Sequence, residues 1–263
     1  FQANNKKINI VNAGIDGQST YGHIKNFDLW FNNIPNLNVK YYLFYIGVND
    51  FHIKENAYFD DLFGNNKDIT IFQKIKNQIK KNSVIYYLFR TIEGTLNAYN
   101  LGIAHNAGHT NIDKKTNKKI LFTKSNFTTE RKIKNYDFIN NRVEQYGERI
   151  KILISKVNSL ESNAIFITQS SRRFWGKHKG LVSGVDEIKG SDIEYTGVDY
   201  YYMSRRFNDK LIQICKENDV MYIDLDEELE FDLEKDFYDQ SHHNDIGAKK
   251  IGKYLYHKLK NLF

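Results

Sequence analysis

The sequence has few of the residues that define several classes of protein. Cys215 is its one cysteine and Pro35 its one proline among 263 residues. A single cysteine excludes an internal disulfide framework and any metal site built from several cysteines. No run of about 18 or more apolar residues occurs, so we expect no membrane span. The chain has no signal peptide and does not begin with methionine, so we expect that it lacks its natural N-terminus.

What is present is typical of a globular protein. Hydrophobic residues make up 41% and charged residues 27%, which favours one folded domain over residues 1–263. The formal net charge is +6, but the lysines are spread along the chain in short runs such as residues 114–119. We interpret these runs as solvated helix faces and loops. A nucleic-acid surface needs basic residues on one face, and no nucleic-acid motif is present, so no such partner is predicted.

Short β-branched or aromatic runs alternate with segments of helical spacing. The runs predict strands at residues 8–12, 40–46, 164–168 and 220–225. Apolar residues three and four apart predict helices over residues 24–34, 71–79, 139–157, 203–214 and 251–259. Ser19 or Thr20 is expected to cap the first helix and Asp245 the last. Residues 51–130 are interpreted as an insert and residues 170–198 as a long loop.

Strands separated by helices predict an α/β protein with a parallel sheet. In such sheets the working residues lie on loops beyond the carboxyl ends of the strands. Three polar clusters fall in the first two strand-to-helix turns and in the last loop.

Asp239-Gln-Ser-His242 is the first of these clusters. An aspartate three residues before a histidine can reach the ring Nδ1 within one loop. That bond fixes the tautomer and stabilises the imidazolium that forms when Nε2 takes a proton. The spacing predicts a general base, His242, oriented by Asp239.

Two further clusters predict donors to an oxyanion. Gly47-Val-Asn49-Asp50 follows a strand, where the Asn49 amide can donate to a developing negative charge. Residues 12–20, Asn-Ala-Gly-Ile-Asp-Gly-Gln-Ser-Thr, turn from a strand into a helix. Gly17 lets the backbone approach a ligand there and offers its N–H. Taken alone, both clusters also fit ordinary turns.

In their order along the chain, the three clusters resemble the motifs of the SGNH hydrolases, also called GDSL-like lipases and esterases. The resemblance runs from the first predicted strand to the last helix. It implies a flavodoxin-like three-layer α/β/α sandwich around a parallel sheet, and hydrolysis of an acyl ester by a Ser-His-Asp triad. Asp239 and His242 would be the acid and base of the triad, and Gly17 and Asn49 would form the oxyanion hole. No metal or organic cofactor is implied.

The family's nucleophile block, a Gly-x-Ser sequence on a central strand, is absent. The resemblance places that strand before Ile8, between the strands predicted at residues 8–12 and 40–46. We therefore expect that the serine lies upstream of this chain. Ser19, on its own strand-to-helix turn, is an alternative nucleophile. A catalytically inactive module that binds a glycan or a protein is the alternative function.

Other residues bear on substrate and location. Arg172 and Trp175 follow a predicted strand and form a candidate substrate loop, because an arginine can hold an acidic group and a tryptophan can stack on a sugar. They favour a carbohydrate-linked O-acetyl ester over other small-molecule esters. His105 and His109 lack a third ligand, so no metal site is predicted. A cell-envelope or periplasmic location would follow only from a signal or anchor in the missing N-terminus.

Overall fold

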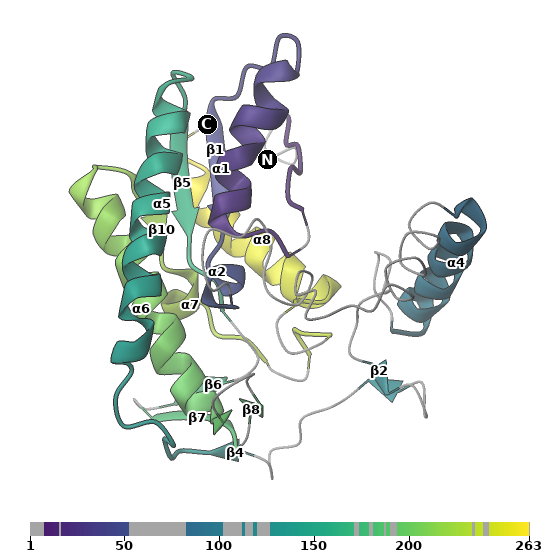
Figure 1. The fold of residues 1–263 in the computed structure, drawn as a ribbon, viewed down its shortest axis with the longest axis vertical. Coiled ribbons are helices and arrows are strands. Elements are labelled where there is room, and N and C mark those ends of the chain that lie inside the picture. The colour runs from purple at the N-terminus through teal and green to yellow at the C-terminus, as the bar shows by residue number, and fades with distance from the viewer. Residues whose placement is uncertain are drawn as a thin grey trace, which may run out of the picture. The chain divides into compact units, whose positions relative to one another are not determined.

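The computed structural model resolves a mixed α/β protein (Figure 1). It describes residues 8–15, 17–52, 83–101, 112–113, 118–119, 127–170, 174–178, 181–186, 188–189, 194–232, 235–238 and 242–262. Two compact units are present, one of residues 1–8, 66–124 and 231–263 and the other of residues 9–65 and 125–230. We call them the terminal unit and the sheet unit. None of the described helices combines the length and hydropathy needed to cross a bilayer.

A three-stranded parallel sheet organises the sheet unit. Its strands are β1 (Tyr41–Tyr45), β5 (Asn163–Ile167) and β10 (Met221–Ile223), in the order β1-β5-β10. Phe44 is paired with Phe166, and Phe166 with Tyr222, so these aromatic rings share one face of the sheet. The parallel sheet and three of the four predicted strands are confirmed. The finer three-layer architecture stays a prediction.

Three helices pack on that aromatic face. They are α1 (Thr20–Leu29), α5 (Asn140–Asn158) and α6 (Gly197–Glu217), and Figure 1 shows α5 and α6 side by side. The core between helices and sheet includes Tyr146, Phe166 and Phe207, all nearly inaccessible to solvent. The predicted helices over residues 139–157 and 203–214 are confirmed. The first helix ends at Leu29 and a 3₁₀ turn, η2 (Phe31–Asn33), follows it.

The strand predicted at residues 8–12 is wrong. Residues 8–15 contain no regular secondary structure. Ile10 and Val11 are 80% and 83% exposed, and Asn12 folds back so that its side chain accepts the N–H of Gly14. A β-branched run becomes a strand only where a neighbouring strand completes its hydrogen bonds. Among the described strands, none pairs with this segment.

The long loop predicted at residues 170–198 is also wrong. It contains β6 (Phe174–His178), β7 (Leu181–Val185), β8 (Ile188–Lys189) and β9 (Glu194–Tyr195). β4 (Phe127–Thr128), β7 and β6 form an antiparallel sheet, and β8 pairs with β9. β8 and β9 have two residues each, and β6 (Phe-Trp-Gly-Lys-His) and β7 (Leu-Val-Ser-Gly-Val) each contain a glycine, so none of them has a clear strand pattern. Thr196, whose side chain accepts the N–H of Asp199, then caps α6.

The terminal unit contains α4 (Val84–Leu101), α8 (Asp245–Leu259) and a small hairpin of β2 (Ile112–Asp113) and β3 (Lys118–Lys119). The hairpin lies within residues 51–130, the segment interpreted as an insert. α8 is confirmed, but Asn244 caps it in place of Asp245, accepting the N–H of Gly247 at 3.0 Å. The helix predicted at residues 71–79 lies outside the described residues. Three short helical turns complete the elements of the described residues: α2 (Val48–His52), η4 (Asp137–Ile139) and α7 (Leu225–Glu228).

Candidate active site

The turn that carries Gly17 is held rigidly at the start of α1. Gly17 has a φ of +70°, in the left-handed region that favours glycine. The next residue, Gln18, is buried, and its amide exchanges two hydrogen bonds of 3.0 Å with the amide of Asn26. Ser19 then caps the helix by accepting the N–H of Gly22. These contacts hold the backbone of the turn against the first turns of α1.

Asn49 lies directly against this turn. It follows β1, and the chain turns out of the strand at Gly47, whose φ is +134°. The Val48 N–H donates to the side-chain oxygen of Gln169, beyond the end of β5. The Asn49 Nδ2 donates to the backbone carbonyl of Gln18 at 3.0 Å. The structure thus brings together the two sequence clusters predicted to form an oxyanion hole.

A buried ion pair ties the two turns to α5. The Asp50 carboxylate accepts the N–H and the hydroxyl of Thr20, and Arg149 donates to the Thr20 hydroxyl at 2.6 Å. Arg149 also contacts the Asp50 carboxylate at 3.1 Å, and both side chains are almost inaccessible. Burial raises the pKa of Asp50, and its contacts with Arg149 and Thr20 oppose that rise. Asp50 and Arg149 position the site, and sequence analysis missed Arg149, which sits 99 residues from Asp50.

Ser19 does not have the surroundings of a nucleophile. Its exposed fraction is 0%, and its hydroxyl serves as the cap of α1. A nucleophilic serine must present its hydroxyl to a substrate and to a general base. The structure therefore argues against the alternative in which Ser19 is the nucleophile.

His242 lies in the terminal unit, three residues before the start of α8. The Tyr238 N–H donates to the His242 carbonyl at 3.1 Å, and Phe237 forms an antiparallel bridge with His243. The His242 side chain is exposed, and its ring stacks on that of Tyr238 at 5.6 Å. Asp239 lies outside the described residues. The Asp239–His242 pair, and the position of His242 relative to Asn49, stay predictions.

The adjacent His243 has a structural role. Its ring packs 4.4 Å from Phe231 and 4.2 Å from Phe237, measured between ring centroids. Burial lowers the pKa of His243 to about 4, although contacts with Asp236 oppose the shift. His243 is therefore neutral at neutral pH. Of the two neighbouring histidines, His242 is the one whose side chain is exposed.

Replacing each of the two glycines of α8 with alanine is expected to change the free energy of unfolding in opposite directions. A Cβ at Gly247 would lie 2.1 Å from the carbonyl oxygen of Asp236, whereas none of the described atoms lies within 4 Å of one at Gly252. Gly252→Ala should raise the free energy of unfolding by about 0.5–1 kcal/mol through helix propensity. Gly247→Ala should lower it by about 1–3 kcal/mol, because the backbone of residue 236 must move. Urea titration measures both, and equal effects would contradict this packing.

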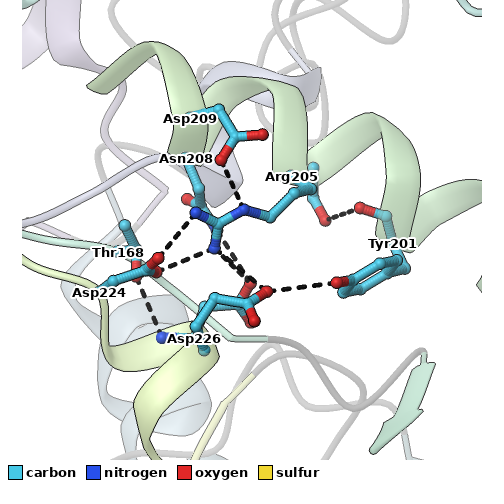
Figure 2. Close-up of polar contacts among 9 residues, drawn as sticks. Thr168, Tyr201, Arg205, Asn208, Asp209, Asp224 and Asp226 are labelled. Carbon is cyan, nitrogen blue, oxygen red and sulfur yellow. Dashed lines mark hydrogen bonds and ion pairs between the residues drawn. The ribbon is translucent and has the colours of Figure 1, made fainter. Parts of the chain in front are cut away.

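A second polar cluster, missed by sequence analysis, occupies the carboxyl ends of β5 and β10 (Figure 2). Arg205 of α6 donates to both oxygens of Asp224, at 2.9 and 2.7 Å, and to Asp209 at 2.7 Å. The Thr168 hydroxyl donates to Asp224 and accepts the N–H of Asp226. The bidentate pair joins the loops after two strands to α6, and we assign it a structural role. Its one signal in the sequence is the spacing of Arg205 and Asp209, four residues apart on a helix.

The remaining candidates are placed only in part. Arg172, His105 and His109 lie outside the described residues. Trp175 lies in strand β6, where the backbone but not the side chain is described. Among the described residues, no group of three or more metal-ligating side chains occurs. Cys215 is buried in the core of the sheet unit, and burial raises the pKa of its thiol to about 12.

Comparison of the chain with models of protein families gave no match, and neither did comparisons with curated proteins or with solved structures.

Proposed function

We propose that this chain is the greater part of an SGNH (GDSL-like) hydrolase that cleaves acyl esters. Asp239 and His242 would activate a serine that lies in a segment preceding Phe1, and Gly17 and Asn49 would bind the oxyanion. The observation that carries the proposal is the hydrogen bond from the Asn49 amide to the carbonyl of Gln18. It joins two motifs, 31 residues apart, whose residues together bind the oxyanion in this family.

The chemistry follows from the groups present. His242 would take the proton of the serine as its oxygen attacks the ester carbonyl, and then return it to the leaving alcohol. Negative charge develops on the carbonyl oxygen in that step. The Asn49 amide has two N–H bonds, and one of them is committed to Gln18. The second, with the Gly17 N–H, is the proposed donor pair for the oxyanion, and both turns are rigid before substrate arrives.

The sheet also supports the proposal. Asn49 follows β1, and Thr168 and Asp224 follow β5 and β10, so polar residues collect at the carboxyl edge where α/β proteins bind ligands. β1 is an edge strand in the described sheet, so a further strand could pair with its outer side. We place the strand that carries the serine beside β1, in a three-layer α/β/α sandwich.

The proposed substrate class is an acyl ester, with O-acetyl groups on carbohydrate as the first compounds to test. The reason is Trp175, which lies on strand β6 of the antiparallel sheet beside α6. A tryptophan is suited to stacking on a sugar ring.

Expression of the full reading frame, with the coding sequence upstream of Phe1, tests the proposal. We expect a Gly-x-Ser sequence at the end of an upstream strand and hydrolysis of p-nitrophenyl acetate by the full product. The 263-residue chain alone should be inactive, because it lacks the nucleophile. A full-length product with neither the serine nor activity would contradict the proposal. The chain would then be an inactive module, and glycan binding would become the property to measure.

Asn49→Ala should lower kcat of the full-length enzyme by about 10²- to 10³-fold, the usual cost of one oxyanion donor. KM should change little, because the donor acts on charge that develops in the transition state. Asn33→Ala is a matched control, since the Asn33 amide also donates to a backbone carbonyl, that of Leu29, at 2.8 Å. Equal activity of the two variants would contradict the proposed role of Asn49 in the oxyanion hole.

A further inference from the structure

Helix α4 of the terminal unit exposes an unusual amount of apolar surface. Six large apolar side chains are between 52% and 84% exposed: Ile85, Leu88, Phe89, Ile92, Leu96 and Tyr99. An α-helix turns about 100° per residue, so these six positions fall within about 100° of arc. They form one continuous apolar stripe, which we call the α4 face.

The burial of α4 is inverted relative to an ordinary surface helix. Such a helix turns its large apolar residues to the core and its polar residues to solvent. Among the α4 side chains that the structure describes, the buried positions are the small residues Gly94 and Ala98, while the large apolar residues are exposed. The polar residues Arg90 and Glu93 occupy helical positions outside the α4 face. A stripe of this kind marks an interaction surface.

The charge of the surrounding sequence indicates what the α4 face meets. Residues 66–124 contain 11 lysines and arginines and three acidic residues, a net charge of +8. The whole chain carries +6, so the other residues together carry −2. The basic excess therefore lies in the segment around α4, with Lys80 and Lys81 just before the helix. An apolar stripe within a basic segment is suited to bind a lipid bilayer whose interior is apolar and whose headgroups are anionic.

We propose that α4 binds the surface of an anionic lipid bilayer and lies in its plane. The α4 face would enter the boundary between headgroups and acyl chains, and the positive charge of residues 66–124 would favour acidic headgroups. This binding is independent of the ester-hydrolase proposal, since it uses no residue of the candidate active site. It would hold the protein at a membrane surface.

Flotation of the purified chain with vesicles tests the proposal. We expect the chain to float with vesicles of phosphatidylserine and phosphatidylcholine, to bind phosphatidylcholine alone much more weakly, and to be released as salt screens the lysines. The triple variant Leu88→Gln, Ile92→Gln, Leu96→Gln should lower the partition coefficient at least about tenfold. Because all three side chains are exposed, the variant should keep the wild-type circular dichroism.

The matched control is Leu29→Gln, Ile152→Gln, Leu160→Gln, which removes the same residue types at exposed positions outside α4. It should bind vesicles as the wild type does. Three results would overturn the proposal: equal binding by the α4 variant, equal binding to neutral and anionic vesicles, and failure of the wild type to bind. The wild type could instead fail to bind vesicles and be a dimer in solution. If the α4 variant is then monomeric, the α4 face is an interface between two copies of the chain.

Discussion

Replacing His242 with alanine is expected to lower ester hydrolysis by the full-length protein at least about 10³-fold. The imidazole is the proposed base that takes the serine proton and the acid that returns it, and removal of one triad member disables the whole unit. The loss should appear in kcat, because the exposed His242 ring does not support the fold. The measurement is steady-state hydrolysis of p-nitrophenyl acetate by the full-length protein.

A nearby exposed histidine provides the control for this result. p-Nitrophenyl acetate is reactive enough to acylate surface imidazoles, so any histidine variant can lose some background rate. His257 is exposed in the last turn of α8, in the same unit as His242. His257→Ala should keep the full enzymatic rate. If the two variants lose activity to the same small extent, His242 is not the base.

Breaking the buried ion pair behind the site should strongly destabilise the protein. In Arg149→Met the Asp50 carboxylate stays buried with no cation, and in Asp50→Asn the guanidinium stays buried with no anion. Each variant should lower the free energy of unfolding by about 3–5 kcal/mol. The double variant buries no charge, so it should be at least about 1 kcal/mol more stable than Arg149→Met. Urea denaturation of the 263-residue chain measures all three.

An exposed ion pair is the control for this series. Lys151 and Glu148 are 2.8 Å apart on the surface of α5, and their side chains are 44% and 66% exposed. Lys151→Met should leave the urea midpoint unchanged, because solvent screens exposed pairs. If Arg149→Met is as mild as Lys151→Met, the Asp50–Arg149 pair does not hold the Gly17 and Asn49 turns together.

The elements that sequence reasoning placed well are those with long periodic patterns. α5 and α6 carry apolar residues every three or four positions over about five turns, and few other structures produce that pattern. β1, β5 and β10 are apolar runs bounded by polar or turn residues. The contact between the Asn49 turn and the Gly17 turn agrees with the family resemblance and not with the predicted strands, because none of the described residues before Gly17 forms a strand.

What the sequence did not reveal depends on contacts between distant residues. Residues 8–12 have the composition of a strand, but a strand also requires a neighbour, and composition says nothing about neighbours. The short strands β6 and β7 are defined by their pairing and not by a pattern of their own. Arg149 and Arg205 looked like ordinary surface arginines on helices. Their burial against carboxylates from other elements is visible only in three dimensions.

The most direct test of the serine-hydrolase proposal is covalent labelling of the full-length protein with a fluorophosphonate. The activated serine oxygen attacks phosphorus and fluoride leaves, so each active site gains one stable phosphonyl group. We predict one adduct per chain by intact mass, mapped to a serine in the segment that precedes Phe1 and lost in His242→Ala. The absence of an adduct, an adduct on Ser19, or labelling that persists without His242 would contradict the proposal.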